Sequence, residues 1–326
     1  MGSLTALNST ERAPRATASG VAGQIAPSSS SSSPPAATNP LALVNLPPLM
    51  EITRGRAETI VALIDGPVAT GHPDLANANI REVPGTVGGR CDRTKSFACM
   101  HGTFVAGILV AARESPARGI CPECTLLVRP IFAETSENTG SMPAATPREL
   151  ATAITDCVNA GANVINISAA LLQATSSDEK ELERSLDHAA KRNVIVVVAA
   201  GNQGTVGSTA ITRHPWVIPV AACDRLGRAV GYSNLGSSIG RRGLSAPGEN
   251  ITSLVANGKH LAFGGTSAAA PFVTGAIALL WSQFPKATAA QLKFAVTNGN
   301  TPRRPAVVPP LLDALAAYQA MSRLMN

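Results

Sequence analysis

Short apolar segments separated by longer amphipathic ones set the pattern of this 326-residue chain. The apolar segments have the length and continuity of strands that are buried on both faces of a sheet. They lie at residues 59–64, 126–132, 164–168, 194–200 and 216–222. Helical periodicity marks residues 101–112, 147–160, 178–192 and 264–281. This alternation predicts an α/β fold, a three-layer sandwich with a mostly parallel central sheet and helices on both faces.

The first 50 residues differ in composition from the rest of the chain. They contain the serine run Ser28–Ser33, followed by Pro34 and Pro35, among scattered Ala, Thr and Gly. Such a segment has too little apolar surface to fold by itself, although residues 41–46 are apolar enough to pack on the folded part. We therefore predict a disordered, low-complexity tail over residues 1–50 and a single catalytic domain over residues 51–326.

Charge and targeting features narrow the classes of partner. The net charge of +6 is spread along the chain, and the basic doublets at 241–242 and 303–304 lack the interleaved aromatic residues that stack on bases. We therefore expect no nucleic-acid partner. No apolar run reads as a membrane span, and the N-terminus lacks a basic region followed by an apolar stretch. We expect no membrane association and a cytoplasmic location.

Three residues at the ends of predicted strands and helices are of the types used in nucleophilic catalysis. Asp65 ends the first apolar segment, His101 opens a helical segment, and Ser267 lies among small residues at the start of the last long helical segment. Pro271 falls where the first turn of that helix is expected, which is the part of a helix that tolerates proline. Because the carboxyl ends of parallel strands meet at one edge of a sheet, we expect these side chains to lie together.

The chemistry of these residue types is that of acyl transfer. A serine hydroxyl needs a base to accept its proton, and His101 is the candidate base for Ser267. A carboxylate at Asp65 would hold the other imidazole nitrogen in the correct tautomer. Asn202, just past a predicted strand, would donate a hydrogen bond to the oxyanion, with the backbone N–H of Ser267 as the second donor.

Four motifs in this order resemble those of subtilisin-type serine proteases, the subtilases. They are VALIDG at 61–66, HGTFVAG at 101–107, AGN at 200–202 and GTSAAAP at 265–271. Any one of them is short, whereas all four in the order Asp, His, Ser are specific, and the resemblance covers residues 59 to about 300. It implies a subtilisin-like fold and a serine peptidase that requires no cofactor. Many subtilases bind calcium. The resemblance leaves calcium binding open for this chain, but the sequence does not support it, because it has no dense acidic loop.

Finer features are similar to the subtilases that mature cyanobactin-like ribosomal peptides. They are DGPV at 65–68, HPDL at 72–75, Cys99-Met100-His101 and VVPPLLDA at 307–314. This branch implies a peptide or precursor-peptide substrate from which a leader or follower segment is removed. Its cyclising members carry a helical lid between Asp and His, and the 36 positions from Asp65 to His101 leave little room for one. Hydrolysis is therefore preferred over the first alternative, a macrocyclase or transpeptidase. The second alternative is a catalytically silent binding module.

One candidate substrate-binding segment departs from the family pattern. Ser168, Ala169 and Ala170 follow a strand where the resemblance places substrate-backbone pairing, but the usual small glycines are missing. Glycines allow close approach of a substrate backbone. We therefore expect these three residues to bind substrate with altered or narrowed recognition.

We predict structural rather than catalytic or metal-binding roles for the cysteines, the other histidines and Asp74. Cysteines lie at positions 91, 99, 121, 124, 157 and 223. Two structural bridges or reduced thiols are favoured over a four-thiolate zinc site at Cys91, Cys99, Cys121 and Cys124, so no metal site is predicted. His72, His188, His214 and His260 show no partner pattern and are expected on the surface or in turns. Asp74 is expected to serve a turn.

Overall fold

A seven-stranded sheet forms the centre of the molecule. The structure is a computed structural model, and it describes residues 39–85, 87, 91–134, 145–168, 176–298 and 306–325. The strand order is β2-β3-β1-β4-β5-β6-β7, and every neighbouring pair is parallel. The strands are β1 (Ile60–Asp65), β2 (Asn79–Glu82), β3 (Thr125–Pro130), β4 (Val164–Ile167), β5 (Ile195–Ala199), β6 (Val217–Cys223) and β7 (Leu244–Pro247). A separate antiparallel hairpin joins β8 (Ile251–Val255) to β9 (Lys259–Phe263). The predicted α/β fold class is confirmed.

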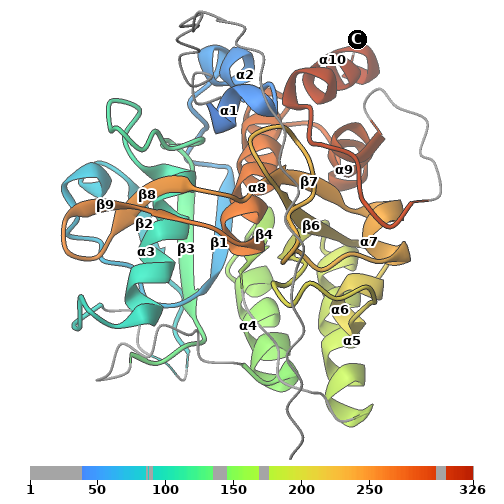
Figure 1. The fold of residues 1–326 in the computed structure, drawn as a ribbon, viewed down its shortest axis with the longest axis horizontal. Helices are drawn as coiled ribbons and strands as arrows, with labels where there is room; N and C mark the ends of the chain where they lie inside the picture. Colours follow the sequence, from blue (N-terminus) through green and yellow to red (C-terminus); the bar gives the residue numbers. More distant parts are fainter. Residues whose placement is uncertain are drawn as a thin grey trace, which may run out of the picture. The chain divides into compact units, whose positions relative to one another are not determined.

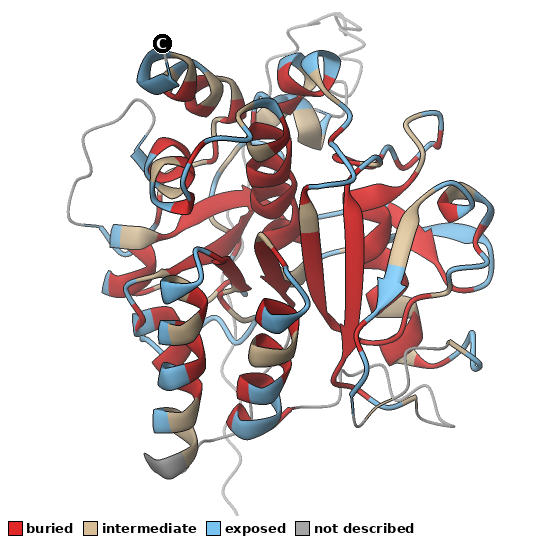
Figure 2. Ribbon diagram, turned by 180° about the vertical axis from the view of Figure 1, so that it is seen from behind, coloured by how far each residue is buried: buried red, intermediate tan, exposed pale blue. Residues whose placement is uncertain are grey.

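Helices cover both faces of this sheet (Figure 1). One core contains residues of α2 (Leu46–Ile52), α3 (Phe97–Val110), α8 (Thr266–Gln283), α9 (Ala289–Asn298) and α10 (Ala314–Met325). The other contains residues of α4 (Pro147–Asn159), α5 (Ser176–Lys191) and α6 (Ala210–Arg213). Successive side chains of β1 alternate between the two, with Val61 and Leu63 in the first core and Ala62 and Ile64 in the second. Figure 2 shows the central strands of the sheet buried, whereas the edge strand β2, the hairpin strand β9 and one side of α4 and of α5 are partly exposed.

The expected boundary at residue 50 falls inside a helix. α1 (Pro40–Leu43) and α2 precede the first strand, and Leu46 and Leu49 are fully buried. The backbone N–H of Ala314 donates to the carbonyl of Val44, which ties this segment to the start of α10. Residues 39–50 thus pack on the folded domain through their apolar side chains. Residues 1–38, the rest of the predicted tail, lie outside the described residues.

The observed starts of two helices change the expected places of His101 and Pro271. α3 begins at Phe97, so His101 is its fifth residue rather than its first. α8 begins at Thr266, so Pro271 is its sixth residue and lies beyond the first turn. The small and apolar residues before His101 are compatible with a helix although they add no amphipathic signal. Of the helices that the structure describes, none has the length and hydropathy needed to cross a membrane.

Backbone contact between α3 and the loop after β1 depends on two glycines. A Cβ added at Gly102 would collide with the carbonyl oxygens of Gly66 and Pro67. A Cβ added at Gly66 would collide with the carbonyl oxygen of Ala98. The absence of both side chains lets the helix that carries His101 approach the end of the strand that carries Asp65.

We expect Gly102→Ala to lower the free energy of unfolding by about 1–3 kcal/mol, because the added methyl group must push α3 away from the 66–67 backbone. Urea unfolding measures this change. Gly71→Ala is the matched control, since nothing lies within 4 Å of a Cβ at Gly71. Equal stability of the two variants would contradict the close-contact argument.

Candidate active site

Asp65 and His101 form a hydrogen-bonded pair at the carboxyl end of β1. The Nδ1 atom of His101 lies 2.8 Å from Oδ1 and 3.0 Å from Oδ2 of Asp65. The Asp65 carboxylate is fully buried and also accepts a hydrogen bond of 2.6 Å from the backbone N–H of Gly66. An ionised carboxylate only accepts hydrogen bonds, so Nδ1 carries the ring proton and Nε2 is left as an acceptor. This is the tautomer that a general base requires.

Ser267 is the second residue of α8, and its position depends on Gly265. Gly265 has φ +134°, a conformation that residues other than glycine rarely adopt, and it is the N-cap residue of the helix. The backbone N–H of Gly265 donates to the carbonyl of Gly248 at 2.7 Å, which fixes the turn before the serine. The N–H groups of the first helical turn have no partner within the helix, so that of Ser267 can face an anion.

Asn202 lies beside Ser267 with a defined amide orientation. Its Oδ1 accepts hydrogen bonds from the backbone N–H of Thr266 at 2.8 Å and from the Thr266 hydroxyl at 3.1 Å. Its Nδ2 group is therefore directed away from Thr266. A Cβ placed on Gly265 would lie 3.1 Å from this Nδ2 and 3.3 Å from Oγ of Ser267. The glycine keeps open the space between the amide donor and the hydroxyl.

These residues line one cleft with a cavity volume of about 240 Å³. It is bounded by His101, Ser168, Asn202 and Ser267, among others. Within the described residues no hydrogen bond joins His101 to Ser267. A contact between nucleophile and base often forms fully only in the substrate complex. The predicted constellation therefore meets in one cleft, with the Asp–His contact formed and the Ser–His contact not formed.

Three phenylalanines form a wall of the cleft that sequence reasoning missed. The ring centroids of Phe97 and His101 are 6.1 Å apart, and Phe263 stands edge-on to Phe97 at 6.2 Å and to Phe104 at 5.4 Å. All three rings line the cleft. In the sequence, Phe97 and Phe104 lie three or four residues from His101 on one helix, which was the available signal. The wall presents apolar surface to the cleft.

The predicted substrate-binding residues are only partly within the described chain. Ser168 is 3% exposed and lines the cleft. Its hydroxyl donates to the backbone carbonyl of Ser267 at 3.3 Å. Ala169 and Ala170 lie outside the described residues. Ser168 thus touches the backbone of the candidate nucleophile, which is a contact that the sequence did not reveal.

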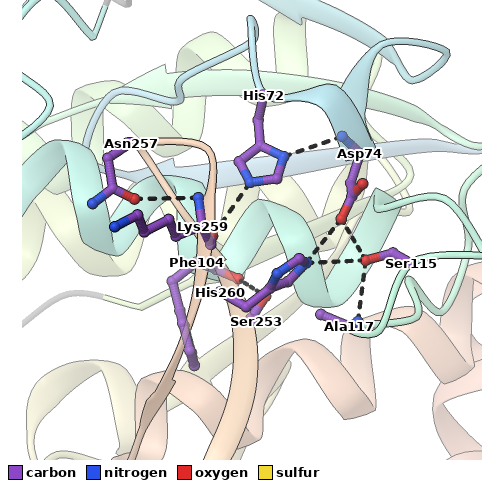
Figure 3. A network of polar contacts seen from close by, with 9 residues as sticks. All are labelled: His72, Asp74, Phe104, Ser115, Ala117, Ser253, Asn257, Lys259 and His260. Atoms are coloured by element: carbon purple, nitrogen blue, oxygen red, sulfur yellow. Dashed lines mark hydrogen bonds and ion pairs between the residues drawn. The ribbon is translucent and has the colours of Figure 1, made fainter.

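Asp74 belongs to a separate polar network at the β8–β9 hairpin (Figure 3). Its carboxylate accepts a hydrogen bond of 2.6 Å from the Ser115 hydroxyl and lies 2.9 Å from Nε2 of His260. His72, which is buried, accepts a hydrogen bond from the backbone N–H of Asp74. His72 was expected on the surface or in a turn; it lies in a turn but is buried. His214, for which the same was expected, is 8% exposed and contacts Asp187. Hydrogen bonds between residues this far apart in the chain leave no periodic pattern in a sequence.

The cysteines do not form the four-thiolate metal site. Cys91 and Cys99 form a disulfide, whereas Cys121, Cys124, Cys157 and Cys223 are free and buried. Burial raises the pKa of the Cys223 thiol to about 12 and also raises that of Cys157. Among the residues that the structure describes, the one cluster of potential metal ligands is Cys91, Cys99 and Glu134. Two of its three members are joined in the disulfide.

Comparison with known proteins identifies sequence relatives of this chain. A family model described as the subtilase family matches residues 56–309. Subtilisin NAT of Bacillus subtilis subsp. natto is 31% identical over 238 residues, which cover 72% of this chain and 58% of that protein. The chain therefore spans less than two thirds of the length of that relative.

Comparison with solved structures agrees with the sequence match. A variant of the protease domain of PatA superimposes with a TM-score of 0.75 at 30% identity, covering 82% of this chain and 97% of that chain. The prenylagaramide maturation protease PagA gives a TM-score of 0.74 at 31% identity, covering 85% of this chain and 98% of that chain. The resemblance to subtilases, and to those that mature ribosomal peptides, thus agrees with these similar sequences and structures.

The Asp74 network predicts a pH-dependent contribution to stability. The hydrogen bond from Ser115 holds the pKa of Asp74 below its ordinary value of 3.8, and His260 acts in the same direction. A depressed folded-state pKa stabilises the fold above the unfolded-state pKa, and this stabilisation is lost as the pH falls through the folded-state value. We expect Asp74→Asn to lower the free energy of unfolding by about 1 kcal/mol at neutral pH and by less as the pH falls below 4.

Urea unfolding at pH 7 and pH 3.5 checks the Asp74 prediction. Asp187→Asn is the control, because Asp187 also contacts a histidine but its side chain is 63% exposed. Exposed pairs contribute little. A destabilisation of Asp74→Asn that does not depend on pH would contradict the assigned role of the carboxylate.

Proposed function

The chain belongs to the subtilase family, and we propose that it is a serine endopeptidase that cleaves peptide bonds through an acyl-enzyme on Ser267. The observation that carries this proposal is the pairing of the buried Asp65 with Nδ1 of His101, which lines the same cleft as Ser267. No metal or cofactor is invoked in this reaction.

The proposed mechanism assigns one task to each residue. Oγ of Ser267 attacks the substrate carbonyl carbon while Nε2 of His101 accepts the hydroxyl proton. Asp65 keeps the Nδ1 proton in place and stabilises the imidazolium. The oxyanion receives hydrogen bonds from Nδ2 of Asn202 and the backbone N–H of Ser267. His101 then protonates the leaving amine, and water releases the acyl group by the reverse sequence.

The proposed substrate is a peptide, and in the finer form a ribosomally made precursor that loses a leader or follower segment. PatA and PagA support this form, since PagA is by name a maturation protease and both are at least 30% identical to this chain. The phenylalanine wall beside His101 favours an apolar or aromatic side chain in the substrate. A substrate-binding role for Ser168, Ala169 and Ala170 and a cytoplasmic location stay predictions.

Labelling with a fluorophosphonate probe tests the proposed nucleophile. We expect one covalent adduct on the wild-type protein in an intact-mass measurement and none on Ser267→Ala or His101→Ala, because the probe requires a serine activated by a base. Ser237→Ala is the matched control, since Ser237 is exposed and also opens a helix directly after a glycine. It should label like the wild type.

Two outcomes of the labelling experiment would overturn the assignment. A folded wild type without an adduct would favour the silent binding module. An adduct that survives in Ser267→Ala would place the reactive serine elsewhere. For a labelled wild type, product masses then separate the remaining alternatives, because hydrolysis adds one water to the summed products and cyclisation adds none.

The oxyanion role of Asn202 gives a separate prediction. Asn202→Ala should lower kcat for peptide cleavage by about 10²–10³-fold with little change in KM, because the lost donor acts mainly on the transition state. Steady-state kinetics on one peptide substrate measure both constants. The neighbouring Gln203→Ala is the control, since Oε1 of Gln203 accepts from Asn234. A similar loss in both variants would contradict the role of Asn202.

A further inference from the structure

The carbonyl of Ser267 lacks the hydrogen bond that a helix normally supplies. In an α-helix, the N–H of each residue donates to the carbonyl four residues earlier. Pro271 lies four residues after Ser267 inside α8 and has no N–H to donate. The carbonyl of the candidate nucleophile therefore needs a partner outside the helix, because a buried unsatisfied carbonyl is costly.

Ser168 supplies that partner at the end of a buried chain of hydrogen bonds. The Ser168 hydroxyl donates to the Ser267 carbonyl at 3.3 Å. Nδ2 of Asn166 donates to Oγ of Ser168 at 2.9 Å, and the Thr274 hydroxyl donates to Oδ1 of Asn166 at 2.8 Å. Asn166 and Thr274 are fully buried, and Ser168 is 3% exposed. The chain thus starts and ends on α8 and passes through β4 and the residue that follows it.

The hydrogen bonds of this chain run in one direction, from Thr274 to the Ser267 carbonyl. The Thr274 hydroxyl donates to the amide oxygen of Asn166, and the amide nitrogen of Asn166 donates to Ser168. Since Ser168 already accepts from that nitrogen, its single proton is left for the Ser267 carbonyl. If the Asn166 amide were reversed, its oxygen would compete for the Ser168 proton and the Ser267 carbonyl would lose its donor.

We propose that Thr274, Asn166 and Ser168 are positioning residues for the nucleophile, which hold the Ser267 peptide in the orientation needed for attack. This proposal rests on the proposed function of Ser267. Because this chain of hydrogen bonds compensates for Pro271, the first turn of α8 stays ordered although the Ser267 carbonyl has no partner within the helix. The geometry of a reacting group must be kept within fractions of an ångström for full activity.

The test compares two variants of Thr274 with a control on the same helix. Thr274→Val removes the hydroxyl at nearly unchanged shape, and Thr274→Ser retains it. The control is Ser282→Ala, which removes another buried hydroxyl of α8 that bonds to Thr59 and to the Ala278 carbonyl. The readouts are the second-order rate constant of fluorophosphonate labelling, kcat and KM on one peptide, and Tm.

We expect Thr274→Val to lower the labelling rate constant and kcat about tenfold with KM unchanged. Thr274→Ser should restore both to within about twofold, since the hydrogen bond to Asn166 is kept. Ser282→Ala should lower Tm without changing the labelling rate. This difference separates positioning from a general loss of stability.

Hydrogen exchange of the segment around Ser267 gives a second, independent readout. The amides of the first turn of α8 should exchange faster in Thr274→Val than in the wild type or in Ser282→Ala, because the Ser267 carbonyl is released. Unchanged exchange together with wild-type labelling in Thr274→Val would overturn the positioning role while leaving the proposed function intact. A folded wild type that does not label would overturn the proposed function and the positioning role with it.

Discussion

The structure depends on the close approach of backbone segments at the carboxyl edge of the sheet. α3 can place His101 against Asp65 only because Gly66 and Gly102 have no side chains where the two backbones meet. Gly265 is equally important on the other side of the cleft, where its positive-φ backbone, which favours glycine, turns the chain into α8. Asp65 itself is fixed by strand β1, which is buried on both faces between two cores. The sheet thus provides the rigid reference, and the glycines allow two helices to bring their side chains to it.

The central strands were predictable because parallel strands buried on both faces leave a continuous apolar signal. All five predicted strands are present, each with bounds within two residues. β2 and β7 were not predicted, because neither has a continuous run of large apolar side chains. β2 has the polar sequence Asn79-Ile80-Arg81-Glu82 with no fully buried residue, and β7 (Leu244–Pro247) has Leu244 as its one large aliphatic side chain. The start of α3 was also misplaced, since its first four residues add no amphipathic contrast. Short or uniformly apolar elements take their identity from tertiary contacts.

The candidate site was predictable to the extent that its chemistry depends on residue type and strand ends. His101, Asn202 and Ser267 line one cleft, and the buried Asp65 contacts His101, as their places in the sequence suggested. The hydroxyls that support them could not be recognised in the same way. Thr274 stands in an apolar helical run, where a threonine is usually a neutral filler, and its partner Asn166 is 108 residues away. Only the packing of α8 on β4 shows that these two polar groups face each other.

Pro271 in α8 changes which group binds the carbonyl of Ser267. A regular helix would bind the Ser267 carbonyl to residue 271 and continue without interruption. With Pro271 in that place, the carbonyl is bonded instead to Ser168, a residue that follows β4 and lines the cleft. The candidate nucleophile is therefore joined through its main chain to the sheet as well as to its own helix. Because β4 is paired with β1 in parallel register, the same sheet holds both Asp65 and the support of Ser267. The two supports therefore belong to one rigid layer, which fixes Asp65 and the main chain of Ser267 relative to each other.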